Sequence, residues 1–320
     1  MDFKNNQGIT KEEAIELSTL SNEHILELMC RANQVRQSFC GNRVDLCSIV
    51  SVRTGGCTED CLFCAQSRLS SAAIQSHGLL TLEQVRASAS SAKEWGASRF
   101  CIVTSGRAVL AKEIGKIEEM IAEVKALGLL PCATLGLMDY PWLLRLKEAG
   151  LHRYHHNLES AEGFFSRICT THAYTDKLHT IEAAIQAGLS VCSGGIFGLG
   201  ESWEDRIEMA FALKSLQVDS IPLNFLTPIH GTPLEIMEPV PPLEALKIIA
   251  IYRLILPDRQ IRICGGRPGT LRQLNSCIFW AGADGLLIGN YLTTTGKEPS
   301  DDMKLIDDLG LIMQHHPVVD

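Results

Sequence analysis

Three cysteines with a compact spacing are the residues of this chain best suited to do chemistry. They lie in the segment Gly55-Gly56-Cys57-Thr-Glu-Asp-Cys61-Leu-Phe63-Cys64. Three thiolates spaced CxxxCxxC can bind three irons of one cubane cluster, and the paired glycines let the backbone curl around it. The fourth iron would then have no protein ligand. Because an open iron can chelate an external molecule, the spacing predicts a cluster that holds the amino and carboxylate groups of a methionine next to a sulfonium.

Structural zinc is the alternative for the same three cysteines. Such zinc sites are usually closed by four protein ligands. The nearest fourth candidate, Cys47, lies inside a predicted strand rather than in a second pair of cysteines. We therefore interpret Cys57, Cys61 and Cys64 as ligands of an iron-sulfur cluster.

Four further cysteines, Cys101, Cys132, Cys192 and Cys264, fall in four different predicted strands. Any one of them alone would more often be a small buried hydrophobe than a ligand. In a closed barrel, however, the inward-facing positions of the strands meet in layers, so four thiols in one layer could bind a second cluster. Cys47 is a weaker fifth candidate. The remaining cysteines are expected to be structural: Cys30, Cys40, Cys169 and Cys277.

Short apolar runs alternate with amphipathic helical runs along most of the chain, which is typical of repeated βα units and a parallel sheet. Strands are predicted at residues 44–52, 99–105, 130–136, 153–159, 190–198, 220–226, 260–266 and 285–290. Helices are predicted at residues 81–95, 112–127, 177–187, 202–216 and 243–256. Eight such units predict a (βα)8 TIM-type barrel, whose reactive groups lie at the C-terminal ends of the strands. An open doubly wound sheet is the alternative, but Gly198 and Gly200 are followed by Trp203 where a dinucleotide loop needs its third glycine.

We expect a single domain over residues 1–320. Residues 1–42 are assigned to N-terminal helices, 43–291 to the barrel, and 292–320 to a C-terminal loop and helix. The N-terminal helices open with the capping pattern Thr10-Lys-Glu-Glu13. No low-complexity stretch or obvious linker divides the chain, so these parts should fold together.

Charge and hydropathy exclude several classes of partner. The formal net charge is -8, and the lysines and arginines are scattered, which argues against nucleic acid or an anionic membrane. Residues 1–8 lack the apolar core of a signal peptide, and the richest apolar run, 246–256, is interrupted by Lys247 and Arg253. Twelve cysteines in a larger chain without an export signal indicate metal or redox chemistry rather than disulfides. We expect a cytoplasmic protein that acts on a small molecule.

The CxxxCxxC motif, with Phe63 just before its last cysteine, resembles that of the radical S-adenosylmethionine superfamily. Within it, the chain resembles the biotin synthases over nearly its whole length. The matching blocks are Arg99-Phe-Cys101, Cys132-Ala-Thr-Leu-Gly136, His156-Asn157-Leu158-Glu159, the run from Val191 to Glu201, and Gly231-Thr-Pro-Leu234. The resemblance implies a (βα)8 barrel, a 4Fe-4S cluster that binds S-adenosylmethionine, and an auxiliary iron-sulfur cluster whose sulfide is inserted into dethiobiotin to form biotin.

In this family the ligands of the auxiliary cluster, usually 2Fe-2S, match Cys101, Cys132, Cys192 and, unusually, Arg262. The chain departs from the family at Cys264, where serine is usual. Residues i and i+2 of a strand face the same side, so Arg262 and Cys264 should both point into the barrel. Since arginine stays protonated under ordinary conditions, a thiolate is the better ligand. We hypothesise a larger four-cysteine cluster, with Arg262 donating to sulfur from behind, and assign Cys192, Arg262 and Cys264 to the catalytic set.

The resemblance also implies residues around cofactor and substrate. The cofactor set is Phe63, Thr104, Asn157, Glu159 and Lys177, with Phe63 near the adenine and Lys177 able to pair with the methionine carboxylate. The substrate set is Asn157, Asn224, Thr293 and Thr294, of which the threonines could receive the dethiobiotin carboxylate. Without the resemblance, a strand-end Asn or Glu would be interpreted as a loop cap, and the threonines as turn formers.

The expected partners are dethiobiotin, an electron donor such as flavodoxin or ferredoxin, and a second copy of the chain in a homodimer. Two other functions stay open. The run from Ile102 to Arg107 resembles a hydrogenase-cluster maturase more than the usual biotin synthase, which would change the substrate. A non-catalytic iron-sulfur carrier is the alternative outside the enzymes.

Overall fold

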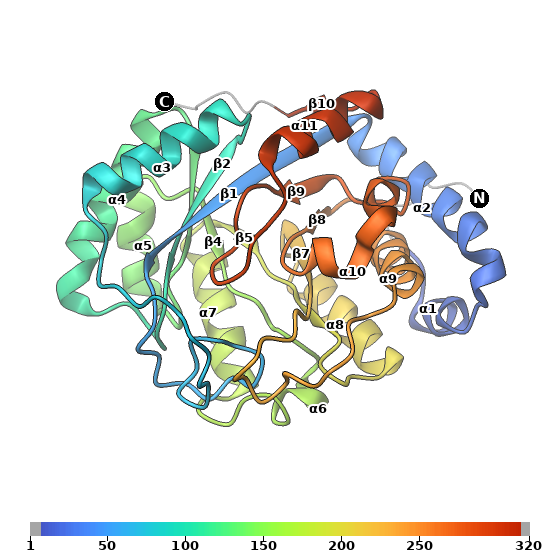
Figure 1. Ribbon diagram of the computed structural model, residues 1–320, viewed down its shortest axis with the longest axis horizontal. Helices are drawn as coiled ribbons and strands as arrows, with labels where there is room; N and C mark the ends of the chain where they lie inside the picture. Colours follow the sequence, from blue (N-terminus) through green and yellow to red (C-terminus); the bar gives the residue numbers. More distant parts are fainter. Residues whose placement is uncertain (1–7, 315–320) are drawn as a thin grey trace.

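The computed structural model describes residues 8–314, and its centre is a closed ring of eight parallel strands (Figure 1). The ring consists of β1 (Arg43–Arg53), β2 (Arg99–Thr104), β3 (Leu130–Thr134), β4 (Arg153–His155), β5 (Ser190–Cys192), β7 (Ser220–Phe225), β8 (Gln260–Ile263) and β9 (Gly285–Leu287). The ring closes because β9 pairs with β1, with Gly285 opposite Asp45. The predicted (βα)8 TIM-type barrel is therefore confirmed.

Two predicted strands end earlier than expected. The chain leaves β4 after His155, and Glu159 has a φ of 71°, a left-handed conformation that a strand cannot continue through. The predicted strand 190–198 is divided into β5 and the short β6 (Gly195–Phe197), which pairs with β7. At the division, a Cβ on Gly194 would lie 2.1 Å from the carbonyl oxygen of Pro222, so only glycine allows this close approach to β7.

Helices cover the outside of the ring. They are α3 (Leu82–Glu94), α4 (Ile114–Ala126), α5 (Tyr140–Glu148), α6 (Glu162–Phe165), α7 (Tyr174–Gln186), α8 (Trp203–Ser215), α9 (Pro242–Ile255) and α10 (Arg267–Leu271). Local sequence fixes several starts: Thr81 and Ser202 accept hydrogen bonds from the third residue of α3 and of α8. The helices predicted from periodicity match α3, α4, α7, α8 and α9 to within a few residues.

The N-terminal helices, α1 (Lys11–Ser18) and α2 (Ile25–Cys40), pack on α9 from outside the barrel (Figure 1). The predicted capping box is present, since Thr10 accepts from the backbone of Glu13 and the Glu13 side chain accepts from Thr10. This second layer explains why every residue of α9 from 245 to 255 is buried. An ordinary barrel helix would keep one polar face in solvent.

The C-terminal segment returns to the barrel. Helix α11 (Pro299–Asp308) is followed by β10 (Ile312–Met313), which pairs with the start of β1. Arg267, just after β8, holds α11 through a buried ion pair with Asp302. Residues 1–7 and 315–320, at the ends of the expected N-terminal and C-terminal parts, lie outside the described residues.

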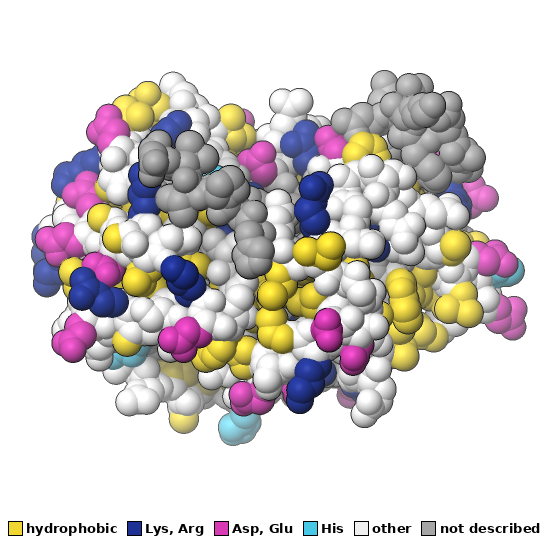
Figure 2. Space-filling view, turned by 90° about the horizontal axis from the view of Figure 1, so that it is seen from above, with side chains coloured by type: hydrophobic (Ala, Val, Ile, Leu, Met, Phe, Trp, Pro, Cys, Tyr) yellow, Lys and Arg dark blue, Asp and Glu magenta, His cyan; other side chains and the backbone are white. Residues whose placement is uncertain are grey.

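The surface agrees with the scattered charges of the sequence. Figure 2 shows lysines and arginines interspersed with aspartates and glutamates over one face, with no broad area of one sign. Among residues 8–314, no helix combines the length and apolar character that crossing a membrane requires.

Candidate active site inside the barrel

A cavity of about 350 Å³ opens inside the barrel, and cysteines are among the residues that line it. The cysteines that line it are Cys47, Cys64, Cys101, Cys132, Cys192 and Cys264. Five of them come from strands or strand ends, where strand alternation turns them toward the inside of the barrel. Cys101 and Cys132 are direct register partners on β2 and β3. The structure thus brings together the four strand cysteines predicted for a second cluster, and adds Cys47.

A charged layer lies beneath these cysteines, toward the N-terminal ends of the strands. Arg99, Arg153 and Arg262 line the cavity, and each precedes an inward-facing residue of its own strand by two positions. Asp45 is fully buried and pairs with two of them, at 2.8 Å to Nε of Arg99 and 3.1 Å to Nη2 of Arg262. Three guanidinium groups against one carboxylate leave positive charge facing the thiols, which favours an anionic occupant.

The guanidinium of Arg262 is held by oxygen atoms on both Nη groups. Nη1 donates to the carbonyls of Asp45 and Leu286, each at 3.1 Å. Nη2 donates to Oε1 of Gln260 at 2.8 Å and pairs with Oδ1 of Asp45. Although burial alone favours the neutral form, the Asp45 carboxylate raises the pKa of Arg262. Arg262 is therefore a protonated, anchored side chain in this structure.

Burial dominates the acid-base behaviour of the cavity thiols. It raises the pKa of Cys264 to about 12, partly offset by the positive charge of Arg262. Burial likewise raises the pKa of Cys101 and of Cys132, and Arg99 opposes the shift at Cys132. Thiols in such a place ionise when a metal ion replaces the proton, as ligand binding requires.

The CxxxCxxC loop follows β1 and lies at the mouth of the cavity. Its two leading glycines have φ values of 82° at Gly55 and 65° at Gly56, and a Cβ on Gly55 would collide with Ser76. The backbone N–H of Gln66 points at Sγ of Cys64 at 3.4 Å. Phe63 and Cys64 line the cavity, whereas Cys57 and Cys61 are half-buried outside its lining.

Asn157 and Glu159 line the cavity at the end of the β4 segment. Nδ2 of Asn157 donates to Glu159 at 3.3 Å, and its Oδ1 accepts from the backbone of Gly194 at 3.1 Å. Burial raises the pKa of Glu159, against the charge of Lys177. Lys177 lies in the first turn of α7, donates to the carbonyl of Asn157 at 3.1 Å, and does not line the cavity itself.

Asn224, Thr293 and Thr294 also line the cavity, at the side formed by β7 and the loop after β9. Asn224 accepts from the backbone of Gly265 at 2.9 Å and donates to the carbonyl of Gly195 at 3.1 Å, so it joins the segment after β8 to the start of β6. The structure does not bring Thr104 into this group. Its hydroxyl is buried away from the cavity because the inward positions of β2 fall on the alternate residues.

Sequence reasoning missed several residues of the site. Asp45, Arg99 and Arg153 could have been found, since each stands two positions before an inward-facing strand residue. Tyr291, whose hydroxyl is buried without a hydrogen-bond partner among the described residues, also lines the cavity. His155 lines it too and shares a hydrogen bond of 2.8 Å with Thr134.

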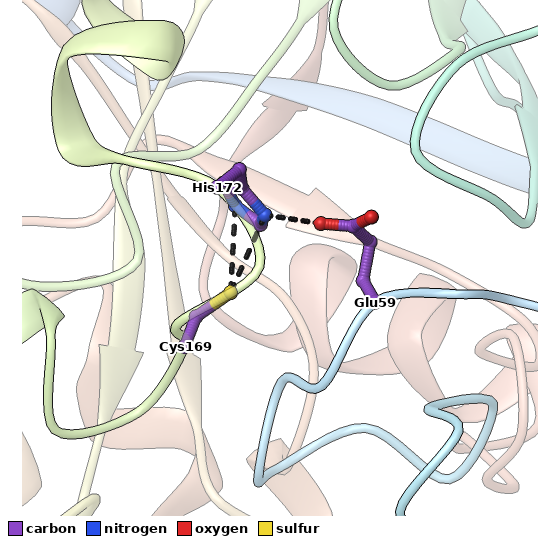
Figure 3. Close-up of side chains that lie close together, drawn as sticks. All are labelled: Glu59, Cys169 and His172. Atoms are coloured by element: carbon purple, nitrogen blue, oxygen red, sulfur yellow. Dashed lines mark hydrogen bonds and ion pairs between the residues drawn. The ribbon is translucent and has the colours of Figure 1, made fainter.

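A second group missed from the sequence lies beside the CxxxCxxC loop. Cys169, His172 and Glu59 are in mutual contact, with the His172 ring between the other two (Figure 3). Nδ1 of His172 is 3.3 Å from Sγ of Cys169 and 2.5 Å from Oε2 of Glu59. Sγ of Cys61 donates to Sγ of Cys169 at 3.7 Å, and this hydrogen bond is the main cause that lowers the pKa of Cys169. Cys169, expected to be structural, thus touches a predicted cluster ligand.

Two family models match the chain. The model described as the radical SAM superfamily matches residues 51–213, and the Biotin and Thiamin Synthesis associated domain matches residues 222–312. Among solved structures, methylornithine synthase superposes with a TM-score of 0.84 at 21% identity, covering 97% of this chain and 95% of that one. A maturase of the [FeFe]-hydrogenase superposes with a TM-score of 0.83 at 19% identity, covering 98% and 74%. At these identities the superpositions show the fold alone.

Curated relatives are much more similar in sequence. The biotin synthase of Thermodesulfovibrio yellowstonii is 51% identical over 292 residues, which cover 91% of this chain and 92% of the relative. The biotin synthase of Geobacter sulfurreducens is 48% identical, covering 96% and 94%. That of Pelotomaculum thermopropionicum is 47% identical and covers 97% of both chains. Identity of this degree over nearly the whole length of both chains shows that the chain belongs to the biotin synthase family.

Proposed function

We propose that this chain converts dethiobiotin to biotin, with the thiol-lined cavity holding the cluster that supplies the sulfur. The observation that carries the proposal is the placement of five strand cysteines around one cavity, above a positively charged layer and directly under the CxxxCxxC loop. One cavity can therefore hold a sulfur source, a substrate and a radical initiator together. The chain is a radical S-adenosylmethionine enzyme of the sulfurtransferase type.

Family membership brings a 4Fe-4S cluster and S-adenosylmethionine with it. The residues fit the cluster: the left-handed glycines allow the loop to curl, and the Gln66 N–H already points at a ligand sulfur, as in iron-sulfur sites. Cys57, Cys61 and Cys64 would hold three irons. When bound, the cluster would supply the electron for reductive cleavage of the sulfonium, and with it the radical chemistry that removes hydrogen from an unactivated carbon of the substrate.

The side chains around the cavity would position the reactants. Phe63 offers a flat apolar surface to the adenine, and Asn157 and Glu159 offer hydrogen-bonding atoms to the ribose or the methionine amine. Lys177, which contacts the Asn157 backbone rather than the cavity, would act by holding that segment in place. Asn224, Thr293 and Thr294 would bind the substrate and hold it in place inside the barrel.

For the auxiliary cluster we propose four thiolate ligands: Cys101, Cys132, Cys192 and Cys264. Arg262 as a ligand would have to lose a proton and give up two hydrogen bonds to oxygen at one Nη group. Cys264 needs to lose only a thiol proton, and the free energy of metal binding offsets the cost of this deprotonation. With its Nη groups held by oxygen atoms, Arg262 would supply positive charge behind the cluster. We keep it with Cys192 and Cys264 in the catalytic set on that basis.

An electron donor such as flavodoxin or ferredoxin would have to approach the CxxxCxxC loop. An open hollow of about 720 Å³ lies on the outer side of this loop and is lined by Arg53, Gly56 and Arg107 among others. Both arginines are paired with carboxylates, Arg53 with Glu113 and Arg107 with Asp176, so the hollow would offer the donor a docking place beside the loop rather than free positive charge. We further propose that the protein is cytoplasmic and forms a homodimer, and that residues 1–320 fold as one domain.

The test of the reaction is anaerobic incubation of the reconstituted enzyme with dethiobiotin, S-adenosylmethionine and a strong reductant. Mass spectrometry would then quantify biotin and 5'-deoxyadenosine. We expect both products. If 5'-deoxyadenosine formed without biotin, the radical chemistry would stand and the substrate assignment would fail, and a hydrogenase-cluster maturase would become the leading alternative. Absence of both products with intact clusters would indicate an iron-sulfur carrier.

The test of the auxiliary ligands is iron and acid-labile sulfide per chain after reconstitution. Wild type should contain about eight irons, as two cubanes require, and Cys264→Ser should lose about four. Cys47→Ser is the matched control, since Cys47 lines the same cavity. About six irons in wild type, unchanged by Cys264→Ser, would overturn the four-thiolate assignment. Loss of iron in the control instead would make Cys47 the fourth ligand.

A further inference from the structure

Cys169 is a buried thiol that the proposed reaction does not use, yet it lies against a cluster ligand. It belongs to the loop between α6 and α7, is 3% exposed, and has its sulfur 3.7 Å from that of Cys61. The two residues are 108 positions apart in the sequence. Their contact therefore depends on how two separate loops are held together.

The two loops are joined by several hydrogen bonds next to this contact. Asp60 accepts from the backbone N–H groups of Thr170 at 2.9 Å and Thr171 at 3.2 Å. On the other side of Cys61, the N–H of Leu62 donates to the carbonyl of Ile168 at 3.0 Å. The Asp60 carboxylate thus holds the residues after Cys169, and the Leu62 backbone holds the residue before it, so the two sulfurs are kept close by hydrogen bonds on both sides.

A metal ion held by Glu59, Cys169 and His172 is one explanation for this cluster. The contacts argue against it, since one nitrogen of His172 already faces both the thiol and the carboxylate (Figure 3). Glu59 also accepts from the Thr171 hydroxyl at 2.8 Å. An ion would have to break these pairs. The group instead forms a chain of contacts that runs from Glu59 through His172 and Cys169 to Cys61.

We propose that Cys169 is a positioning residue whose S–H donates a hydrogen bond to the sulfur of Cys61 when that sulfur binds iron. This inference rests on the proposed role of Cys61 as a cluster ligand. An iron-bound sulfur carries no hydrogen, so the direction of the hydrogen bond between the two sulfurs must reverse. Hydrogen bonds to cluster sulfurs stabilise the more negative, reduced cluster and so raise its reduction potential. Cys169 thereby makes the cluster easier to reduce.

The test is a redox titration of the reconstituted enzyme, followed by electron paramagnetic resonance of the reduced cluster. The signal of this cluster is identified by its change on adding S-adenosylmethionine. Cys169→Ala should lower the equilibrium constant for reduction by about two- to tenfold, the range expected for one hydrogen bond. A tenfold drop corresponds to about 59 mV for one electron. Cys169→Ser keeps an O–H donor and should restore most of the wild-type potential.

Two controls separate this effect from damage to the fold. Iron content must match wild type in each variant, and Cys277→Ala, which removes a half-buried thiol of the segment after α10, should leave the potential unchanged. An unchanged or raised potential in Cys169→Ala would overturn the proposal. Failure of biotin formation would not affect this readout, whereas retention of the cluster in Cys61→Ala would remove the proposed function on which it rests.

Discussion

Replacing Asp45 by asparagine should strongly destabilise the barrel, because this one carboxylate forms ion pairs with two buried arginines, Arg99 and Arg262. Asp45 is 0% exposed, and Arg99 and Arg262 are each 4% exposed, so solvent screens neither pair. Removing one partner of a buried pair costs about 3 to 5 kcal/mol. The amide side chain of the variant would keep the shape of the carboxylate but leave both arginines without this counter-charge. We therefore expect a loss of at least about 3 kcal/mol, out of the roughly 5 to 15 kcal/mol that folded domains possess.

The assay is urea unfolding of the reduced, metal-free chain, so that cluster binding does not contribute. Glu123→Gln is the matched control, because it removes one carboxylate from an exposed pair with Arg86 and should leave the unfolding midpoint close to wild type. Adding Arg99→Met to the Asp45→Asn variant should recover part of the loss, since it removes one of the two buried charges that lost the Asp45 carboxylate. A midpoint for Asp45→Asn equal to that of the control would refute the reasoning.

Three further changes probe other parts of the structure. Burial lowers the pKa of His155 to about 4 from an ordinary value of 6.5, so the unfolded chain binds this proton at a higher pH than the folded chain does. The stability of the fold should therefore decrease as the pH drops from about 6.5 toward 4. Unfolding midpoints measured across that range should decline less in His155→Gln than in wild type. Gly266→Ala should lower the free energy of unfolding by more than about 1 kcal/mol in thermal unfolding, because φ is +76° and the new Cβ would lie 1.9 Å from a carbonyl oxygen of β7. The control Gly115→Ala adds a Cβ with no atom within 4 Å and should not destabilise the fold. Asp302→Ala should cost about 3 to 5 kcal/mol by stranding the buried Arg267, and proteolysis should then cut α11 first; equal cleavage of wild type would contradict this.

The barrel could be predicted from the sequence because its information is local. Each βα unit carries an apolar run and an amphipathic run, and eight repeats in one chain leave few other arrangements. The cysteine-lined cavity was predictable for a similar reason. Strand alternation decides which residues face inward, so Cys101, Cys132 and Cys192 could be placed in the barrel from their strands alone.

Features that depend on contacts between distant segments could not be predicted. The division of the fifth predicted strand follows from the close approach of Gly194 to Pro222, which no local pattern records. The contact of Cys169 with Cys61 depends on Asp60 and Leu62 joining two loops. In the sequence alone, Cys169 is one more cysteine outside a strand, and a structural role was the reasonable expectation.

Strand parity also links the stability of the barrel to its chemistry. Asp45, Arg99 and Arg262 each stand two residues before a cysteine that faces the cavity, so the charged layer and the thiol layer are set by the same alternation. If one of these strands slipped by one residue, its charged residue and its cysteine would both turn to the outside of the barrel. The charged layer and the thiol layer are therefore held at a fixed spacing along each strand. For this reason Asp45, which touches no reactant, is expected to control both the folding of the barrel and the charge that the cluster cavity presents.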